Sequence, residues 1–202
     1  MIRLGKIGLR EIGLLTVALI EFAALTPPAR AQAVATTENL VNQLAGLETT
    51  ADLDVAALRQ QALERVKSKA DAIPLKRPPV TAQLLKLPQF IADVQFDPDT
   101  SIIRPESYRT LGRIADTLGH PTLLPYGFLI VGHTDATGKR EYNLTLSQRR
   151  ADSIREVLVT TFKISPKRLQ SVGLGEEQLQ DAVHPAAAIN QQVQIVTVAR
   201  AP

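Results

Sequence analysis

Two short segments, GHTDATG at residues 132–138 and NLTLSQRRA at residues 143–151, decide how this chain folds. The first follows the apolar run 128–131, which has a glycine on each side and is typical of a buried strand. Apolar residues then recur at helical spacing as far as Leu158, so the sequence predicts a strand, a loop and a long helix. Asp135 would lie in the loop at the end of the strand, where α/β sheets commonly bind ligands.

Arg150 stands on a helix face that is otherwise apolar. It belongs to a row of residues four positions apart, which share one face: Tyr142, Leu146, Arg150, Ile154 and Leu158. A partly buried guanidinium needs an acceptor, and either Asp135 or the carboxylate of a ligand can supply it. Two interpretations stay open. The pair is a structural ion pair, or it is a clamp in which Arg150 binds the carboxylate and Asp135 the ammonium of a free amino-acid head group.

Together the two segments resemble the signature of the OmpA C-terminal-like domain family, over about residues 90–199. The family includes the peptidoglycan-associated lipoproteins and the periplasmic part of the flagellar stator. Its members bind the diaminopimelate of peptidoglycan stem peptides without covalent chemistry. The resemblance implies that Asp135 and Arg150 are the two main diaminopimelate contacts, and it favours the clamp over the structural ion pair.

Further residues are expected to support this site. The loop contributes Thr134 and Thr137, and the following helix Asn143 and Ser147, which brace the site in the family. The resemblance places the turn at residues 97–101 on the rim of the pocket, with Asp97 and Asp99 in it. Both aspartates can instead be ordinary turn formers, which the residues alone favour.

One departure from the family pattern concerns the last strand. The family usually has asparagine, two arginines and valine before it, whereas this chain has Asn190, Gln191, Gln192 and Val193. The two missing charges would have paired with carboxylates or with the anionic wall. The departure predicts weaker binding to peptidoglycan, or it marks this chain as a divergent relative of the family.

The order of the elements indicates an α+β fold. Strands are expected at 91–96, 128–131, 169–173 and 192–198, with helices at 105–118 and up to about Phe162. With the resemblance, this order implies a βαβαββ sandwich with a mixed sheet, preceded by an N-terminal helical segment. The domain itself is expected at residues 90–199.

The part of the chain before this domain divides into three segments. Residues 1–31 have a basic start, an apolar centre and the A-x-A motif at 29–31, so we expect a cleaved signal peptide, with an uncleaved anchor as the alternative. Residues 32–73 are expected to be helical. Residues 74–89 are rich in proline and predict an extended, semi-rigid linker.

The N-terminal helices carry the competing hypothesis for function. Their apolar faces can pack against the domain, or they can self-associate or bind an envelope protein through residues 33–73. In that second case the chain is a periplasmic protein-interaction module, and the pair Asp135 and Arg150 is merely structural.

Composition excludes several other classes. The net charge is +3 and no basic run with interleaved aromatic residues occurs, which argues against nucleic acid. Cysteine is absent, and the three histidines lack metal-ligand spacing: His120, His133 and His184. Ser147 lacks the flanking glycines of the sharp strand-to-helix turn that carries a nucleophilic serine in many hydrolases. We expect a non-enzymatic peptidoglycan-binding protein without cofactor or metal, located in the periplasm and associated with the cell wall or outer membrane of a Gram-negative envelope.

Overall fold

The computed structural model describes residues 36–47, 53–69 and 73–200. The expected signal peptide at residues 1–31 lies outside the described residues, as do residues 48–52 and 70–72 between the helices. In the part of the chain that is described, no helix has the length and apolar character needed to cross a membrane.

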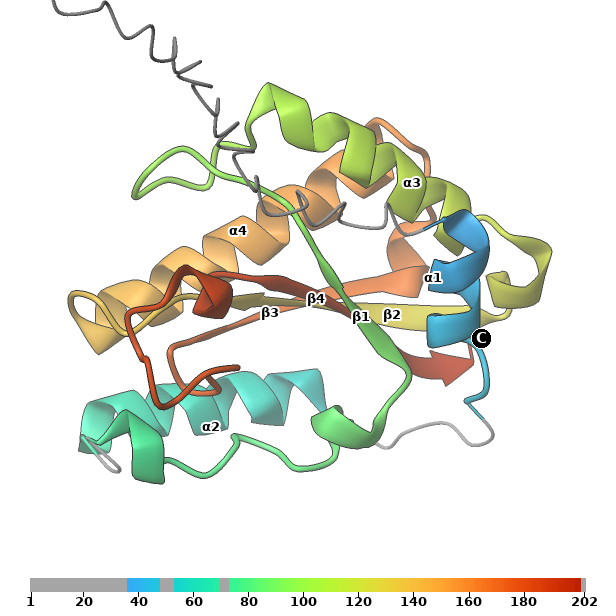
Figure 1. Ribbon diagram of the computed structural model, residues 1–202. Coiled ribbons are helices and arrows are strands. Elements are labelled where there is room, and N and C mark those ends of the chain that lie inside the picture. Colours follow the sequence, from blue (N-terminus) through green and yellow to red (C-terminus); the bar gives the residue numbers. More distant parts are fainter. Residues whose placement is uncertain (1–35, 48–52, 70–72, 201–202) are drawn as a thin grey trace, which may run out of the picture. The chain divides into compact units, whose positions relative to one another are not determined.

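A four-stranded mixed sheet forms the centre of the fold (Figure 1). Its strands, in spatial order, are β1 (Gln89–Ala92), β4 (Val193–Arg200), β2 (Tyr126–His133) and β3 (Leu169–Gly175). The β2–β3 pair is parallel, and β4 pairs antiparallel with both β1 and β2. Helix α3 (Tyr108–Leu118) connects β1 to β2, and helix α4 (Arg140–Thr160) connects β2 to β3. The predicted α+β fold with a βαβαββ order and a mixed sheet is confirmed.

The central strand β2 is buried on both faces. Phe128 and Ile130 belong to a hydrophobic cluster formed with α1 (Thr37–Leu44), α3 and α4. Leu129 and Val131 belong to a second cluster, formed with α2 (Val55–Ser68). Figure 1 shows α2 on the opposite side of the sheet from α3 and α4. The uninterrupted apolar run 128–131 therefore reflects a strand that is covered on each side.

Both N-terminal helices use their apolar faces inside the chain. The buried residues are Leu40, Val41 and Leu44 in α1, and Val55, Leu58, Ala62 and Val66 in α2. Asp54 caps α2 by accepting hydrogen bonds from the backbone N–H groups of Ala56 and Ala57, at 2.9 and 3.0 Å. These faces are the ones that self-association of the helices would need, and here they pack on the domain.

The proline-rich segment differs from the expected extended linker. Residues 73–88, which we call the strap, contain two 3₁₀ turns, Pro74–Lys76 and Leu84–Lys86. Val80 and Leu84 are buried in the same cluster as α2. The prolines exclude long helices or strands, but they leave room for short turns that place apolar side chains against the sheet. The strap thus covers part of the second face and does not separate the helices from the domain.

Two predicted helix residues lie nearer the surface than expected. Tyr108 and Tyr142 are 44% and 41% exposed, although the helical spacing of the apolar residues at 105–118 and the row that contains Tyr142 predict an inward position for each. Each stands in the first turn of its helix, α3 or α4, where the helix extends past the sheet. Ile73, the last residue of the expected helical segment 32–73, is exposed and lies after α2, which ends at Ser68.

Two glycines allow α4 to lie unusually close to the ends of β2 and β3. A Cβ at Gly132 would stand 2.3 Å from the carbonyl oxygen of Ser147, and one at Gly173 would stand 2.1 Å from the backbone nitrogen of Gln148. Both distances are far below van der Waals contact. Gly132 and Gly173 are therefore explained by close packing between strand and helix.

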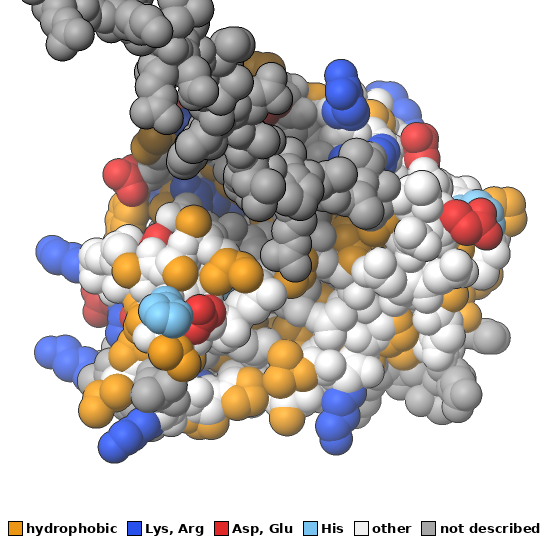
Figure 2. Space-filling view, viewed as in Figure 1, with side chains coloured by type: hydrophobic (Ala, Val, Ile, Leu, Met, Phe, Trp, Pro, Cys, Tyr) orange, Lys and Arg blue, Asp and Glu red, His pale blue; other side chains and the backbone are white. Residues whose placement is uncertain are grey.

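On the face seen in Figure 2, lysine and arginine side chains are spread along the margin, with acidic and apolar side chains among them. Among the described side chains visible on that face, they form no continuous basic patch.

Candidate functional site

The loop after β2 holds the carboxylate of Asp135 in one position. Its Oδ1 accepts hydrogen bonds from the backbone N–H of Thr137, at 2.9 Å, and from the hydroxyl of Thr137. Its Oδ2 accepts a hydrogen bond from the side-chain amide of Gln191, at 2.5 Å. Asp135 is only 6% exposed. The side chain is thus oriented by neutral donors, and no cation among the described residues contacts it to cancel its charge.

Arg150 is held by contacts with the segment between β1 and α3. Its Nε donates to the carbonyl oxygen of Thr100 at 2.9 Å, and its guanidinium lies 4.9 Å from the centre of the Phe96 ring. Burial lowers the pKa of Arg150 below its ordinary value; Asp99 raises it again most strongly, followed by Tyr142 and Asp135. The guanidinium stays charged, because the ordinary pKa of arginine is so high.

Asp135 and Arg150 line one pocket of about 430 Å³. Within the described ranges, no ion pair within 4.0 Å joins the two side chains, since Arg150 bonds to a carbonyl and Asp135 to neutral donors. The direct ion pair of the structural interpretation is therefore not formed. Two carboxylates, of Asp99 and Asp135, and two guanidiniums, of Arg104 and Arg150, line the pocket. A lining with both signs of charge suits a ligand that is itself zwitterionic.

The other expected supporting residues divide into those at the pocket and those behind it. Thr134, Thr137 and Asn143 line the pocket. The hydroxyl of Thr134 is buried without a hydrogen-bond partner among the residues described. Ser147 is fully buried behind the pocket, where its hydroxyl accepts from the N–H of Gly175 at 2.8 Å and donates to the carbonyl of Leu144. Ser147 therefore joins α4 to the end of β3.

The two aspartates of the turn at residues 97–101 have different positions. Asp99 lines the pocket in a left-handed backbone conformation (φ 55°), and its carbonyl accepts a hydrogen bond from the Tyr142 hydroxyl at 3.0 Å. Asp97 does not line the pocket, and its half-exposed carboxylate pairs with Arg104 at 3.3 Å. Asp97 serves the turn, whereas Asp99 adds charge to the rim.

His133 is buried at the end of β2 and does not pair with Ser147. Its Nε2 lies 3.1 Å from the side-chain oxygen of Gln194, and its backbone N–H donates to Gln192. Burial lowers the pKa of His133 to about 4, although the contact with Gln194 raises it slightly. The imidazole is therefore neutral at pH 7. In the described part of the chain, no cluster of three or more histidine, aspartate or glutamate side chains forms a metal site.

The comparisons with known proteins agree with this architecture. Residues 95–192 match the model of the OmpA family. Those residues form an OmpA family domain. The chain is 37% identical over 112 residues to outer membrane porin F of Pseudomonas fluorescens, and 39% identical over 83 residues to the peptidoglycan-associated lipoprotein of Mesorhizobium japonicum. These alignments cover 54% and 41% of this chain, and 33% and 48% of the relatives. The chain thus spans about a third to a half of the length of these relatives.

Among solved structures, the peptidoglycan-associated lipoprotein from Burkholderia pseudomallei is 30% identical. The match covers 62% of this chain and 98% of that one, with a TM-score of 0.43. The OmpA domain begins near β1, so α1, α2 and the strap lie before the segment that matches the family model.

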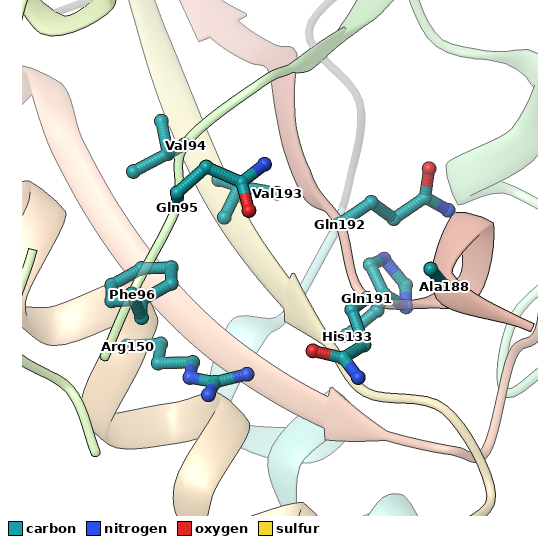
Figure 3. A pocket seen from close by; sticks show the side chains of 9 residues that line it. All are labelled: Val94, Gln95, Phe96, His133, Arg150, Ala188, Gln191, Gln192 and Val193. Atoms are coloured by element: carbon teal, nitrogen blue, oxygen red, sulfur yellow. The ribbon is translucent and has the colours of Figure 1, made fainter. Parts of the chain in front are cut away.

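A second, smaller pocket of about 170 Å³ adjoins the first in the OmpA domain. Phe96, Gln95, Arg150 and Gln191 line both pockets. Figure 3 shows Arg150 and Phe96 on one side of this pocket and Gln191 on the other. The side-chain oxygen of Gln192, also in its lining, is buried and lacks a hydrogen-bond partner among the described residues.

Three residues contribute to the site although the sequence does not indicate that role. Gln191 stands where the family usually has an arginine, yet its amide holds Asp135. Phe96 and Arg104 also line the pocket. Phe96 follows the first strand and Arg104 precedes Pro105, so their location near the turn was visible in the sequence. Their orientation toward Arg150 and the pocket depends on contacts between distant segments.

Proposed function

We propose that this chain binds peptidoglycan without covalent chemistry, by holding the zwitterionic end of diaminopimelate between Asp135 and Arg150. The observation that carries the proposal is a pair of opposite, buried charges that face one pocket without neutralising each other. Asp135 would bind the ammonium group. Arg150 would bind the carboxylate through its two terminal nitrogens, since its Nε is occupied by Thr100.

The surroundings of the two charges favour a polar guest. Buried charges need partners, and a free carboxylate beside a free guanidinium would otherwise collapse into an ion pair. The contacts from Thr137, Gln191 and Thr100 hold the two groups apart. The unpartnered hydroxyl of Thr134 adds a hydrogen-bonding group for the ligand.

The relatives support the class of ligand and the location. One of them is named a peptidoglycan-associated lipoprotein and another an outer membrane porin. A peptidoglycan ligand and a position in the Gram-negative envelope agree with those names. Under this proposal the domain anchors the chain, or whatever partner its remaining segments bind, to the cell wall.

Sedimentation with insoluble peptidoglycan tests the proposal. We expect Asp135→Asn and Arg150→Met to lower the retained fraction so that apparent affinity falls by about tenfold or more, because each removes a charge-assisted contact. The matched controls are Asp116→Asn and Arg149→Met, whose side chains are exposed on α3 and α4. Both controls should sediment as the parent does.

Competition by free ligands tests the chemistry of the clamp. Diaminopimelate should release the bound protein, whereas Nα-acetyl-lysine amide, whose α-amino and α-carboxyl groups are both blocked, should not. If Asp135→Asn and Arg150→Met fold and still sediment like the parent, the clamp is wrong. Binding would then fall to another surface, or the chain would act through its N-terminal helices. Equal competition by Nα-acetyl-lysine amide would show that the pocket recognises a different feature of the ligand.

A further inference from the structure

A buried cluster of four charged side chains lies outside the lining of the ligand pocket. It consists of Arg77 from the strap, Arg140 from the start of α4, and the consecutive Glu176 and Glu177 after β3. The two glutamates are 5% and 1% exposed, and the side chain of Arg77 is 2% exposed. Two positive and two negative charges balance in this cluster, as buried ionic groups require.

The contacts in the cluster are divided between the two arginines. Arg140 forms a fork with Glu177, at 2.9 Å from Nε to Oε1 and 2.7 Å from Nη2 to Oε2. Arg77 binds Glu176 through both the backbone carbonyl, at 2.5 Å, and the carboxylate, at 3.4 Å. Arg77 is also 3.6 Å from the carboxylate of Glu177. Arg77 therefore fixes both the main chain and the side chain of Glu176.

Glu176 connects this cluster to the loop that carries Asp135. Its second carboxylate oxygen accepts a hydrogen bond from the side-chain amide of Asn143 at 2.7 Å. The same amide nitrogen lies 3.2 Å from the carbonyl oxygen of Asp135 and 2.9 Å from that of Thr137. A continuous series of hydrogen bonds thus runs from the strap through Glu176 and Asn143 to the loop.

The start of this series lies before the OmpA domain. Arg77 precedes residue 95, where the family match begins. The strap is itself fixed by the burial of Val80 and Leu84 and by hydrogen bonds from Arg65 to the carbonyls of Pro78 and Pro79. A segment outside the matched region therefore contacts the support of the binding loop directly.

We propose that Arg77 is a positioning residue that holds the Asp135 loop in its binding geometry through Glu176 and Asn143. Without Arg77, two buried carboxylates share one guanidinium, and Glu176 loses the contact that fixes its main chain. Glu176 then leaves Asn143, and the loop carbonyls lose their common donor. The role in binding rests on the proposed function, but the position of the loop can be measured without a ligand.

Hydrogen exchange of three loop amides in the full chain tests this role. The N–H of Thr134 donates to Gly175, that of Ala136 to Pro185 and that of Thr137 to Asp135. In Arg77→Met these amides should exchange about tenfold faster than in the parent, because the loop opens more often. Retention on peptidoglycan should fall in the same variant.

The matched control is Arg59→Met. Arg59 joins α2 to the sheet by donating to the carbonyl of Ser171 at 2.9 Å and to the side chain of Gln148 at 3.3 Å, with no carboxylate involved. Its loss should leave exchange of the three loop amides unchanged. Equal acceleration in Arg59→Met and Arg77→Met would mean that loosening of the whole second layer is responsible, and would overturn the proposal.

Two further outcomes complete the test. Parent-like exchange in a folded Arg77→Met overturns the proposal. If that variant does not fold, the double variant Arg77→Met/Glu176→Gln restores the balance of charge in the cluster. It should still show fast exchange of the loop amides. Parent-like exchange in the double variant, or its failure to fold, means that Arg77 serves the fold alone. If the parent fails to bind peptidoglycan while Arg77→Met loosens the loop, the proposed function is wrong and the positioning role remains.

Discussion

The two faces of the central sheet are both buried, yet different parts of the chain cover them. Helices α3 and α4, which lie inside the OmpA domain, cover the first face together with α1. Helix α2 and the strap cover the second face, and both precede the segment that matches the family. β2 contributes Phe128 and Ile130 to one side and Leu129 and Val131 to the other.

This comparison shows that the folded unit extends beyond the segment that matches the family in sequence. The polar residues proposed to bind the ligand come from the matched segment, at the ends of its strands and on α4. The cover of the second face, and the arginine proposed to position the Asp135 loop, come from residues 53–69 and 73–88. Three predictions test the packing of these layers and the buried groups at the ends of the strands.

The largest effect is expected from deleting core side chains in each layer. Leu58 in α2 and Leu158 in α4 are 2% and 0% exposed. If both layers belong to one core, Leu58→Ala and Leu158→Ala should each lower the free energy of unfolding by roughly 2–5 kcal/mol, through lost burial and a cavity. Urea denaturation measures both values.

Leu85→Ala is the control for the second layer, since Leu85 is 54% exposed in the strap and should change stability little. A loss for Leu58→Ala as small as that of Leu85→Ala would show that α2 is an appendage. The comparison between the two faces would then fail.

The next effect concerns how closely α4 approaches the sheet. Gly173→Ala places a Cβ 2.1 Å from the backbone of Gln148, so α4 must move outward. We expect a loss of about 3 kcal/mol, at the upper end of the usual cost of overpacking. Thermal and urea unfolding measure it.

Gly112→Ala in α3 is the matched control on the same face. Its added Cβ meets only the Phe162 ring, at 3.7 Å, which is ordinary contact. Because alanine favours a helix, this change should be neutral or stabilising by about 0.5–1 kcal/mol. A tolerated Gly173→Ala would mean that the contact between α4 and β3 is not a rigid one.

The smallest effect is a pH dependence of the free energy of unfolding, which comes from His133 and not from the apolar residues of either layer. The pKa of His133 is about 4 in the folded chain against an ordinary 6.5, because burial disfavours the charged ring. The unfolded chain therefore binds more protons between these two values, and stability is full above pH 6.5 and falls as the pH drops toward 4. Between pH 7 and pH 5 this group should account for a loss of about 2 kcal/mol.

His133→Gln should remove this part of the pH dependence. The measurement is the free energy of unfolding at pH 7 and pH 5 in both proteins, because carboxylates contribute equally to each and cancel in the difference. If the parent and His133→Gln lose the same stability on acidification, the ring is not desolvated as its burial indicates.

Local patterns in the sequence predicted most of the fold. Alternation and helical spacing located β2, β3, β4 and the helices α3 and α4, since period and burial are linked within one element. The first strand was expected at 91–96 but lies at Gln89–Ala92, so its position was only partly predicted. The motif at residues 132–138 located the loop with Asp135. Tyr142 was misplaced because periodicity does not show where a helix extends beyond the sheet it packs on.

The residues that hold the site in place were less accessible to sequence analysis. Gln191 holds Asp135 across 56 positions, and the carbonyl of Thr100 holds Arg150 across 50. Asp97 and Asp99 are two residues apart, but only Asp99 lines the pocket. Such contacts depend on how loops from separate elements meet.

The sequence by itself determined the α+β class, the order of the elements and the presence of opposite charges at the end of β2 and on the inner side of α4. Only the tertiary structure decided that these charges remain apart, that the proline-rich segment covers a face of the sheet, and that Arg77 contacts the support of the binding loop. The physical reason is the separation along the chain of the residues that interact. Hydrophobic periodicity acts between neighbours in the chain, whereas the partner of a buried polar group is selected by contacts that exist only after the layers have packed.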